Sequence, residues 1–405
     1  MASDLCEGRC TATSVDSEGV TQEDACANCE RVSKEYCKRS SDANIFLIHT
    51  NRSVVKHKAK NSPTKSKVLD LIKTRAAALR NSKGGSILVH LEGQDRSDRC
   101  LEYFDEFISK GLTALIEDGS LFVNVFTREW LSASKVYKDH ADFVLLRVGK
   151  TESISTVDFN TKVRNDIENE HPSTVNIVSL LSNKDGERYS KAKLLELPGD
   201  TETFHESRHV EHKAFKPQQK KILQLERDED SVFDYIWSGL KLKDNITSFS
   251  KYFGGGSIFV GIAESTIEET GSKVLTGVGF DIVDAEGYHL KHISKDVFEI
   301  GIDKETFYKK LTDKITQNTS LLYASGRFTT EIPQDLVKLK LHPVSPTNRY
   351  ILQVAVGYVE GIVFYDKKGP RTYFVKDLSN KMVCERMSMK DWILRLKRHC
   401  ILCKT

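Results

Sequence analysis

Three glutamates and a lysine between residues 206 and 264 carry side chains suited to metal-assisted cleavage of a phosphodiester. Glu206 and Glu211 lie five residues apart, Lys213 follows two residues later, and Glu264 comes after a glycine turn and a short apolar stretch. Hard divalent cations such as Mg²⁺ and Mn²⁺ prefer oxygen ligands, and carboxylates from distant segments can surround one ion. A nearby lysine would neutralise a phosphate, so the group suggests a nuclease-type site.

This segment resembles the second lobe of the core of the Schlafen family, which belongs to the AlbA-like class also called divergent AAA. The family pattern contains two glutamates, a lysine, a helix, a Gly-Gly turn, an apolar strand and a final acid. The corresponding positions here are Glu206, Glu211, Lys213, Gly255–Gly256 and Glu264. The resemblance implies that the three glutamates bind Mg²⁺ or Mn²⁺ and that the lysine contacts the phosphate. The implied substrate is structured RNA such as tRNA or rRNA.

Three positions depart from the family pattern. His212 stands where the family has an aromatic residue, Tyr252-Phe253 replaces an Asn-Thr pair, and Glu264 replaces an aspartate. Relative to an aspartate, the longer glutamate moves its carboxylate by roughly 1.5 Å, the length of one C–C bond. The final acid is therefore the altered member of the predicted metal-binding set.

The composition limits where an RNA-binding surface can lie. The 405-residue chain has a net charge of only +3, so such a surface must come from local clusters of basic residues. The candidate RNA-binding residues are Lys56, Lys58, Lys60, Lys216, Lys220 and Lys221. No apolar run is long enough to span a bilayer, and the N-terminus lacks a signal-peptide core. We therefore expect a cytoplasmic protein, with the nucleus as an alternative, and no membrane partner.

The nine cysteines are unevenly placed and crowd the N-terminal residues. Cys26 and Cys29 have the spacing of a zinc knuckle, and Cys6 or Cys10 together with Cys37 would complete four ligands. The surrounding segment is rich in Ser, Thr, Asp and Glu and contains few apolar residues. The preferred interpretation is a disordered tail with reduced cysteines, and zinc at Cys26 and Cys29 is the alternative.

Two parts of the chain repeat a local pattern. Lys83–Leu91 and Gly255–Ile262 both read as a glycine turn that leads into an apolar strand, and Val55–Ala59 parallels Val210–Ala214. Internal repeats indicate duplicated structural units. Together with the resemblance, the repeat predicts an α+β fold. Two pseudo-repeated AlbA-like lobes, with mixed sheets and flanking helices, would form a U-shaped groove.

The alignment of the two parts distinguishes their roles. Lys56 stands in the place of Glu211 and Gly93 in the place of Glu264, so the first lobe is expected to lack the metal site. The predicted organisation is a disordered cysteine-containing tail, a non-catalytic lobe, a bridging region and a lobe with the acidic site. These parts correspond to residues 1–43, 44–148, 149–200 and 201–405.

These observations favour a divalent-metal-dependent endoribonuclease that acts on structured RNA. One alternative is a non-catalytic RNA-binding protein in which the altered Glu264 has removed the metal. Another, implied by the resemblance, is one subunit of a hetero-oligomeric nuclease that processes small-RNA precursors. The expected partners are RNA and other Schlafen-like chains in a homo- or hetero-oligomer.

Overall fold

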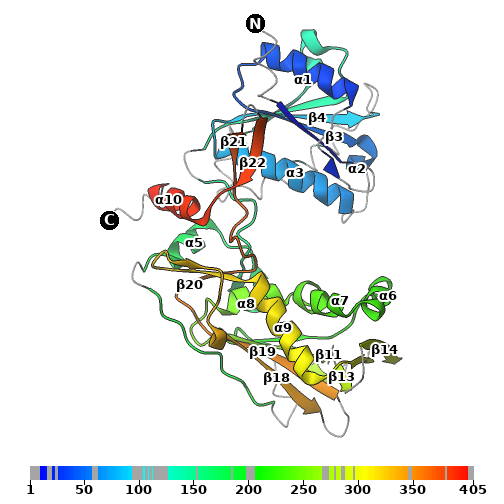
Figure 1. Ribbon diagram of the computed structural model, residues 1–405, viewed down its shortest axis with the longest axis vertical. Coiled ribbons are helices and arrows are strands. Elements are labelled where there is room, and N and C mark those ends of the chain that lie inside the picture. The colour runs from blue at the N-terminus through cyan, green and yellow to red at the C-terminus, as the bar shows by residue number, and fades with distance from the viewer. Residues whose placement is uncertain are drawn as a thin grey trace. The chain divides into compact units, whose positions relative to one another are not determined.

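The computed structural model shows a mixed α+β chain that divides into two compact units (Figure 1). Unit 1 contains Met1–Asp158 and Pro370–Thr405, and unit 2 contains Phe159–Gly369. Unit 2 is therefore an insertion within unit 1. This division differs from the predicted one, because residues 159–200 belong to unit 2 and the last residues return to unit 1.

The structure describes parts of both units. The described residues are 10–15, 21–22, 26–56, 63–93, 104, 108, 112, 126–151, 154–183, 186–197, 206–266, 273–277, 280–283, 288–294, 297–344, 349–378 and 381–399. Cys6, Lys58 and Lys60 lie outside them. For some further site residues only the backbone is described, and these are Cys10, Lys56, Lys220 and Glu264.

Unit 1 contains a six-stranded sheet with a parallel pair at its centre. In spatial order its strands are β2 (Thr21–Gln22), β1 (Cys10–Val15), β3 (Ile45–Asn51), β4 (Gly85–Glu92), β6 (Phe143–Val148) and β5 (Phe126–Trp130). β3 is parallel to both β1 and β4, and β6 is antiparallel to β4. Parallel neighbours need a crossover connection, and helix α3 (Pro63–Arg80) lies between β3 and β4 in the chain.

The two central strands of unit 1 are apolar on both faces. Successive strand residues point to opposite faces, so Phe46 and Ile48 pack in the core beneath α3, whereas Ile45 and Leu47 pack on the other face. Helix α1 (Ala27–Arg39) covers that second face. Continuous apolar strands are typical of a sheet that is covered on both sides.

Helix α1 lies in the segment whose composition predicts a disordered tail. Its residues Cys29, Val32, Tyr36 and Cys37 are all buried. Their spacing places them on one stripe of the helix, and the thiol of Cys26 accepts a hydrogen bond from the N–H of Cys29 at the N-terminus. The expected disorder is therefore not found in residues 26–39, because cysteine and tyrosine supply an apolar face within a polar segment.

The residues after Gly369 complete unit 1. Arg371 forms an ion pair with Asp70 of α3, with nitrogen and oxygen 2.6 Å apart. Trp392 is almost fully buried, and its indole Nε1 donates to the hydroxyl of Thr156. The elements of this returning segment are β21 (Tyr373–Leu378), β22 (Lys381–Arg386) and α10 (Met389–His399).

Unit 2 contains a seven-stranded sheet in which β9 lies at one edge. Its strands are β14 (His289–Ser294), β15 (Val297–Gly301), β13 (Phe280–Val283), β19 (Arg349–Val356), β10 (Gly256–Val260), β9 (Val210–Lys213) and, paired to β19, β18 (Val337–Val344). Smaller pairings join β7 (Val163–Asn165) to β8 (Glu168–Glu170), β11 (Ile262–Thr266) to β12 (Lys273–Gly277), and β16 (Ser320–Tyr323) to β17 (Phe328–Thr329) and β20 (Gly361–Phe364).

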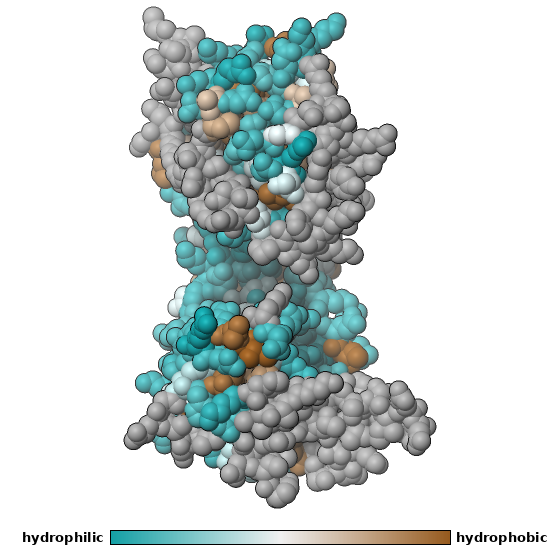
Figure 2. Space-filling model, turned by 90° about the vertical axis from the view of Figure 1, so that its right-hand side faces the viewer, coloured by the Kyte–Doolittle hydropathy of each residue, from teal (hydrophilic) through white to brown (hydrophobic). Residues whose placement is uncertain are grey.

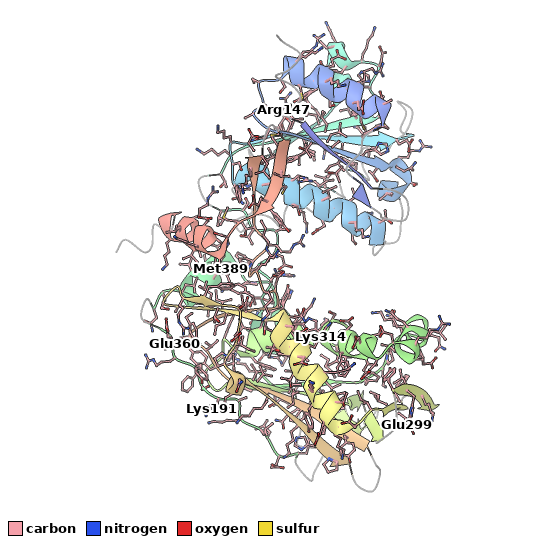
Figure 3. The ribbon with its side chains drawn as sticks, viewed as in Figure 1. Arg147, Lys191, Glu299, Lys314, Glu360 and Met389 are labelled. Atoms are coloured by element: carbon pink, nitrogen blue, oxygen red, sulfur yellow. The ribbon has the colours of Figure 1, made fainter. Side chains whose placement is uncertain are left out.

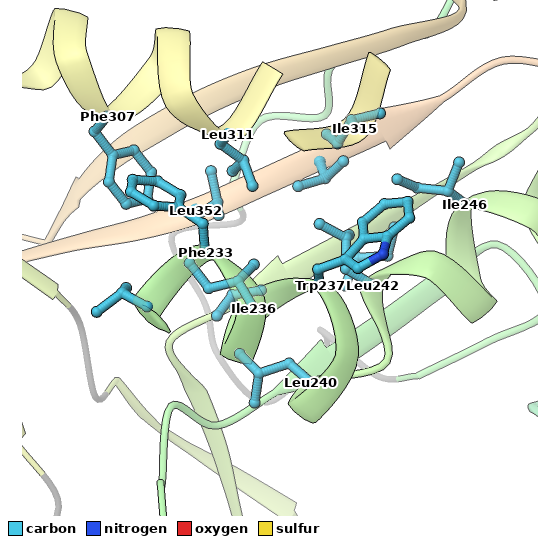
Figure 4. Packing of buried hydrophobic residues seen from close by; sticks show 14 of the residues in the cluster. Phe233, Ile236, Trp237, Leu240, Leu242, Ile246, Phe307, Leu311, Ile315 and Leu352 are labelled. Atoms are coloured by element: carbon cyan, nitrogen blue, oxygen red, sulfur yellow. The ribbon is translucent and has the colours of Figure 1, made fainter. Parts of the chain in front are cut away.

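Helices of unit 2 pack with its sheet in one hydrophobic core. Phe307, Leu311 and Ile315 recur at a spacing of four along one helix, and Figure 4 shows Phe307 and Leu311 near Phe233 and Leu352. This spacing gives a single apolar stripe toward the sheet. The helical elements are α5 (Thr174–Leu180), α6 (Gln219–Arg227), α7 (Glu229–Asp234), a π-helical turn at Tyr235–Gly239, α8 (Leu242–Phe249) and α9 (Lys304–Asn318).

Each unit contains a parallel strand pair with an antiparallel third strand. In unit 1 these are β3, β4 and β6, and in unit 2 they are β9, β10 and β19. In both, a glycine turn precedes the second strand. A serine follows each turn, and its N–H donates to a carbonyl just before the first strand. In unit 1, Ser86 donates to Asn44 at 2.9 Å, and in unit 2, Ser257 donates to His209 at 2.8 Å. The glycine turns therefore occupy equivalent places.

The same pairing corrects the upstream part of the predicted repeat. Glu211 pairs with the third residue of β10, and the third residue of β4 pairs with Phe46 of β3. Lys56 instead ends the short helix α2 (Arg52–Lys56). The predicted equivalence of Lys56 and Glu211 is therefore wrong, because β9 corresponds to β3.

We predict that Gly255→Ala destabilises unit 2 far more than Gly254→Ala. Both residues have positive φ, +68° and +94°, so both variants carry backbone strain of roughly 1–2 kcal/mol. A Cβ on Gly255 would also lie 1.9 Å from the carbonyl oxygen of Val356, whereas one on Gly254 would meet only His209, at 3.9 Å. Amide hydrogen exchange of the β10 peptide should therefore accelerate strongly only in Gly255→Ala. Equal protection in both variants would contradict the close strand approach.

Candidate functional site

The predicted acidic segment forms the edge strand of the unit 2 sheet and the turn before it. Glu211 and Lys213 are two residues apart in β9, so their side chains share one face. Glu211 pairs with Ile258 of β10, which belongs to the core beneath the helices. The carboxylate of Glu211 therefore enters the helix-covered face of the sheet, and only 7% of the residue is exposed.

Two cations neutralise the carboxylate of Glu211. Its Oε2 accepts from Nη2 of Arg164 at 2.8 Å, and its Oε1 contacts Nζ of Lys213. The side chain of Arg164 is fully buried, stacks on the ring of Phe249, and also donates to the carbonyl of Ser207 at 2.9 Å. Arg164 comes from β7, so the site joins the β7–β8 hairpin, α8 and β9.

Glu206 precedes this edge strand, and Glu264 lies in a separate strand. A tight turn pairs Ser207 with Val210, and it brings Oε1 of Glu206 to 3.0 Å from the N–H of His212, which donates to it. Glu264 lies in β11, where its Cα pairs with Leu275. The chain reaches β11 through Gly261, whose N–H donates to the carbonyl of Lys213 at 2.8 Å. The side chain of Glu264 lies outside the described residues.

The described residues do not support a Mg²⁺ or Mn²⁺ site at Glu211. Glu206, Glu211 and Lys213 lie at one edge of the sheet. Both oxygens of Glu211, however, already contact cations, and the guanidinium of Arg164 is buried. A divalent ion bound there would face two positive charges at short range, which disfavours binding.

The predicted RNA-binding lysines have different settings. Lys216 and Lys221 are exposed, and the ammonium of Lys221 lies 5.8 Å from the ring centre of Tyr235. Lys220 lies in α6 and Lys56 in α2, and for both only the backbone is described. Three of the predicted lysines come soon after the acidic segment in the chain: Lys216 lies before α6, and Lys220 and Lys221 lie in it.

A group of aromatic and cationic side chains lies beside the acidic segment. The aromatic surface, as we call it, consists of Arg208, His209, Tyr252, Phe253 and Tyr358. Phe253 is 88% exposed, and its ring lies 5.8 Å from that of Tyr358. Tyr252 contacts His209 edge-on at 6.0 Å, and the guanidinium of Arg208 lies 5.9 Å from the ring of Tyr252. The hydroxyl of Tyr252 donates to the carbonyl of Arg164, which links this surface to the buried ion pair.

A second group of side chains, in unit 1, could hold a metal ion. Cys26, Cys29, His49 and His90 each offer one ligand atom, and these atoms all lie within 4.8 Å of one another. Cys26 and Cys29 come from the start of α1, and His49 and His90 are paired residues of β3 and β4. Burial raises the pKa of the Cys29 thiol. Among the residues whose side chains are described, this is the group with metal-ligand geometry.

An acid holds one histidine of this group in place. Nε2 of His90 donates to Oδ2 of Asp142 at 2.8 Å, and the ring of His90 stacks on Phe143 with centres 4.4 Å apart. Burial by itself favours the protonated form of Asp142, but the hydrogen bond from His90 holds the pKa of its carboxyl below the ordinary value. The ring orientation of His90 is therefore set by both neighbours.

The grouped partners of Cys26 and Cys29 differ from the predicted ones, because His49 and His90 join them and Cys37 does not. Cys37 is buried in the core of α1, away from the four grouped ligand atoms, and the side chains of Cys6 and Cys10 lie outside the described residues. His49 and His90, and not further cysteines, supply the other two candidate ligand atoms. A signal for them is present in the sequence, because each histidine follows at least three consecutive apolar residues in a segment that reads as a strand.

The chain matches no protein-family model, and the curated proteins contain no match to it. None of the described helices combines the length and the apolar character needed to cross a membrane. On the face shown in Figure 2, most of the described residues are hydrophilic, and the hydrophobic ones form small separate groups.

We predict that Arg164→Met costs about 3–5 kcal/mol of stability, because it leaves the carboxylate of Glu211 buried with one cation fewer. The double variant Arg164→Met/Glu211→Met should recover much of this loss. Lys191→Met is the matched control, because it breaks an exposed ion pair with Asp335, for which about 1 kcal/mol or less is expected (Figure 3). Urea unfolding measures all three variants. A cost for Arg164→Met no larger than that of the control would exclude a structural ion pair.

A pH dependence is expected from Lys251, which follows α8. Its Nζ donates to the hydroxyl of Thr161 and to the carbonyl of Thr247, and burial lowers the pKa of Lys251 to about 7. The unfolded chain keeps the ordinary value of 10.5, so it binds more protons between these two values and unit 2 gains stability as the pH rises. In Lys251→Met this gain should disappear. Urea unfolding of both proteins at pH 7 and about pH 9.5 measures the change in the free energy of unfolding. An equal change in the wild-type protein and in Lys251→Met would refute the prediction.

Proposed function

We propose that this chain is an RNA-binding protein of the Schlafen-like type, and that its acidic segment is a structural ion-pair cluster. The observation that supports this proposal most directly is the aromatic surface, in which Phe253 is 88% exposed. Contiguous exposed apolar groups often mark a binding site, and Phe253 lies beside the ring of Tyr358. The proposed ligand is RNA with unpaired loops, such as tRNA.

The chemistry of the aromatic surface suits unpaired bases. Bases that are splayed from loops stack on aromatic rings and on arginine guanidinium groups. Phe253 and Tyr358 offer two neighbouring rings, and Arg208 places a positive charge over Tyr252 for the phosphate backbone. The exposed Lys216 and Lys221 add sequence-independent phosphate contacts nearby in the chain. Double-stranded segments would then be recognised through their backbone and loops through their bases.

The ion pairs of Glu211 favour a non-catalytic role. A catalytic metal would need a carboxylate that is open to solvent and substrate, and Glu211 is buried between Arg164 and Lys213. An arginine guanidinium stays charged at all ordinary pH values, so it does not release Glu211 by losing a proton. The geometry therefore favours the alternative in which the altered acidic set has lost its metal.

We also propose that the two units arose as duplicated AlbA-like lobes. This rests on the shared order of a parallel pair, a glycine turn and an antiparallel third strand in both units. In this proposal unit 1 contributes the lobe without the acidic residues. The insertion of unit 2 into unit 1 is a departure from a simple tandem arrangement.

The metal-dependent endoribonuclease remains the second candidate, and one observation favours it. Lys213 covers Oε1 of Glu211 with a side chain that is 27% exposed, so it can turn away toward a phosphate. The vacated oxygen, Glu206 and Glu264 would then bind Mg²⁺ or Mn²⁺ while Arg164 keeps the other oxygen. In the hetero-oligomeric alternative, a second Schlafen-like chain would supply the missing part of this metal site for the same RNA cleavage.

We predict that Phe253→Ala weakens the binding of an RNA hairpin with an unpaired loop by roughly tenfold, because stacking contributes about 1–3 kcal/mol per base. Val175→Ala is the matched control, since Val175 is an exposed apolar residue at 71% and lies outside the aromatic surface. Fluorescence anisotropy of the labelled hairpin, with a fully paired duplex beside it, measures the effect. The proposal fails if the full chain does not bind the hairpin, or if both variants bind equally.

The same samples decide between the two candidates. With Mn²⁺ added, the non-catalytic protein leaves the hairpin and total tRNA intact on a denaturing gel. Cleavage that disappears with EDTA and in Glu206→Gln would establish the nuclease instead. Glu206 is the better position for this test, because it is only partly buried and its loss leaves the Arg164–Glu211 ion pair in place.

A further inference from the structure

We propose that unit 1 binds one structural zinc ion through Sγ of Cys26, Sγ of Cys29, Nδ1 of His49 and Nδ1 of His90. This site is separate from the acidic segment and from the aromatic surface, which belong to unit 2. It joins the start of α1 to the two central strands of the sheet. The inference is independent of the proposed function and holds whether or not the chain binds RNA.

The distances between the ligand atoms are close to those around a tetrahedral ion. With Zn–S bonds of about 2.3 Å and Zn–N bonds of about 2.0–2.1 Å, neighbouring ligand atoms stand roughly 3.3–3.8 Å apart. The thiol of Cys29 lies 3.1 Å from Nδ1 of His90 and 3.6 Å from Nδ1 of His49, and Cys26 lies 3.5 Å from His90. The two imidazole nitrogens are 2.8 Å apart, and all four ligand atoms lie within 4.8 Å of one another, so the ion requires the two rings to move apart.

The hydrogen bonding of His90 prepares it as a ligand. Nε2 faces the carboxylate of Asp142 at 2.8 Å and therefore carries the proton. In the neutral imidazole the other nitrogen, Nδ1, then has a free lone pair, and this nitrogen points at the two thiols. A carboxylate behind a ligating histidine is the usual outer partner of zinc sites. Asn28 also donates to Asp142, at 3.1 Å, and holds the carboxylate in place.

The backbone brings the four ligands together without strain in any one element. His49 and His90 are register partners in parallel strands, so their side chains point to the same face. Ile45, Leu47 and Leu88 put α1 on that face. The two-residue spacer between Cys26 and Cys29 turns both thiols toward the sheet at the beginning of α1.

The ligand set selects zinc among common biological cations. Two thiolates and two imidazoles are soft or borderline donors, which disfavour Mg²⁺ and Ca²⁺ and suit Zn²⁺. Binding releases the thiol protons of Cys26 and Cys29, so two thiolates balance the charge of the ion in a largely buried place. Four protein ligands fill the tetrahedron, which is the arrangement of a structural site and not of a catalytic one.

A disulfide between Cys26 and Cys29 is the main competing explanation. The two cysteines have the spacing of a redox pair at a helix N-terminus. Two histidine nitrogens that converge on the thiols are not needed for a disulfide, but they complete a metal site. Oxidation would remove both thiolate ligands, so the two explanations predict different masses and different metal contents.

The first test is the zinc content of the full-length chain, purified without a metal-affinity step and measured by inductively coupled plasma mass spectrometry. One zinc per chain is expected, and Cys26→Ser/Cys29→Ser should contain none. Cys37→Ala and Cys384→Ala are matched controls that should keep the ion, because each removes a cysteine outside the ligand group. A wild-type chain without zinc, or an intact mass lower by two hydrogens, would overturn the proposal.

A second measurement identifies the ligands even if the double variant does not fold. Cobalt replaces zinc in the wild-type chain, and the absorption bands of tetrahedral Co²⁺ with two thiolates are expected. His90→Cys should keep the metal and shift these bands toward three thiolates, whereas an unchanged spectrum would exclude His90 as a ligand. Asp142→Asn should weaken zinc in chelator competition by about 10–100-fold. Equal affinity in that variant would refute the role of Asp142 as the outer partner.

Discussion

Parallel strand pairing in a fixed register is the constraint on which both candidate sites depend. In unit 1 the β3–β4 register places His49 beside His90, and in unit 2 the β9–β10 register places Glu211 beside Ile258. A shift of one residue would turn each side chain to the other face of its sheet. His49 would then face α3, and Glu211 would leave the helix-covered core. The chemistry of both sites therefore follows from backbone hydrogen bonds that involve none of the reactive groups.

Both sites place a polar group on a covered face of a sheet, and the two groups are compensated in different ways. Burial of an isolated charge is unfavourable unless a partner compensates for it. At Glu211 the compensation comes from the opposite charges of Arg164 and Lys213. At His90 it comes from Asp142 on one side of the ring and from the sulfur atoms of Cys26 and Cys29 on the other. Residue type alone does not distinguish these outcomes.

The local elements were more accessible to sequence reasoning than the contacts between them. The two glycine turns and the strands that follow them are found where the repeat predicts them, because Gly-Gly followed by an apolar run is a strong local signal. Helix α1 was not predicted from the sequence, because its buried stripe consists of cysteine, valine and tyrosine within a polar segment. Arg164 lies 47 residues before Glu211, and only the packing of a hairpin brings them together. His49 and His90 are separated by 41 residues, and strand pairing decides their contact.

The insertion of unit 2 has a consequence for how the protein is made. Asp158 and Arg371 are bridge partners, so the chain leaves unit 1 and returns to it at one place. During synthesis the six-stranded sheet and α1 emerge from the ribosome before unit 2, but β21, β22 and α10 emerge after it. Unit 2 is therefore translated in full before β21, β22 and α10, which unit 1 needs to complete its fold. Unit 1 therefore begins to emerge before unit 2 and is completed after it.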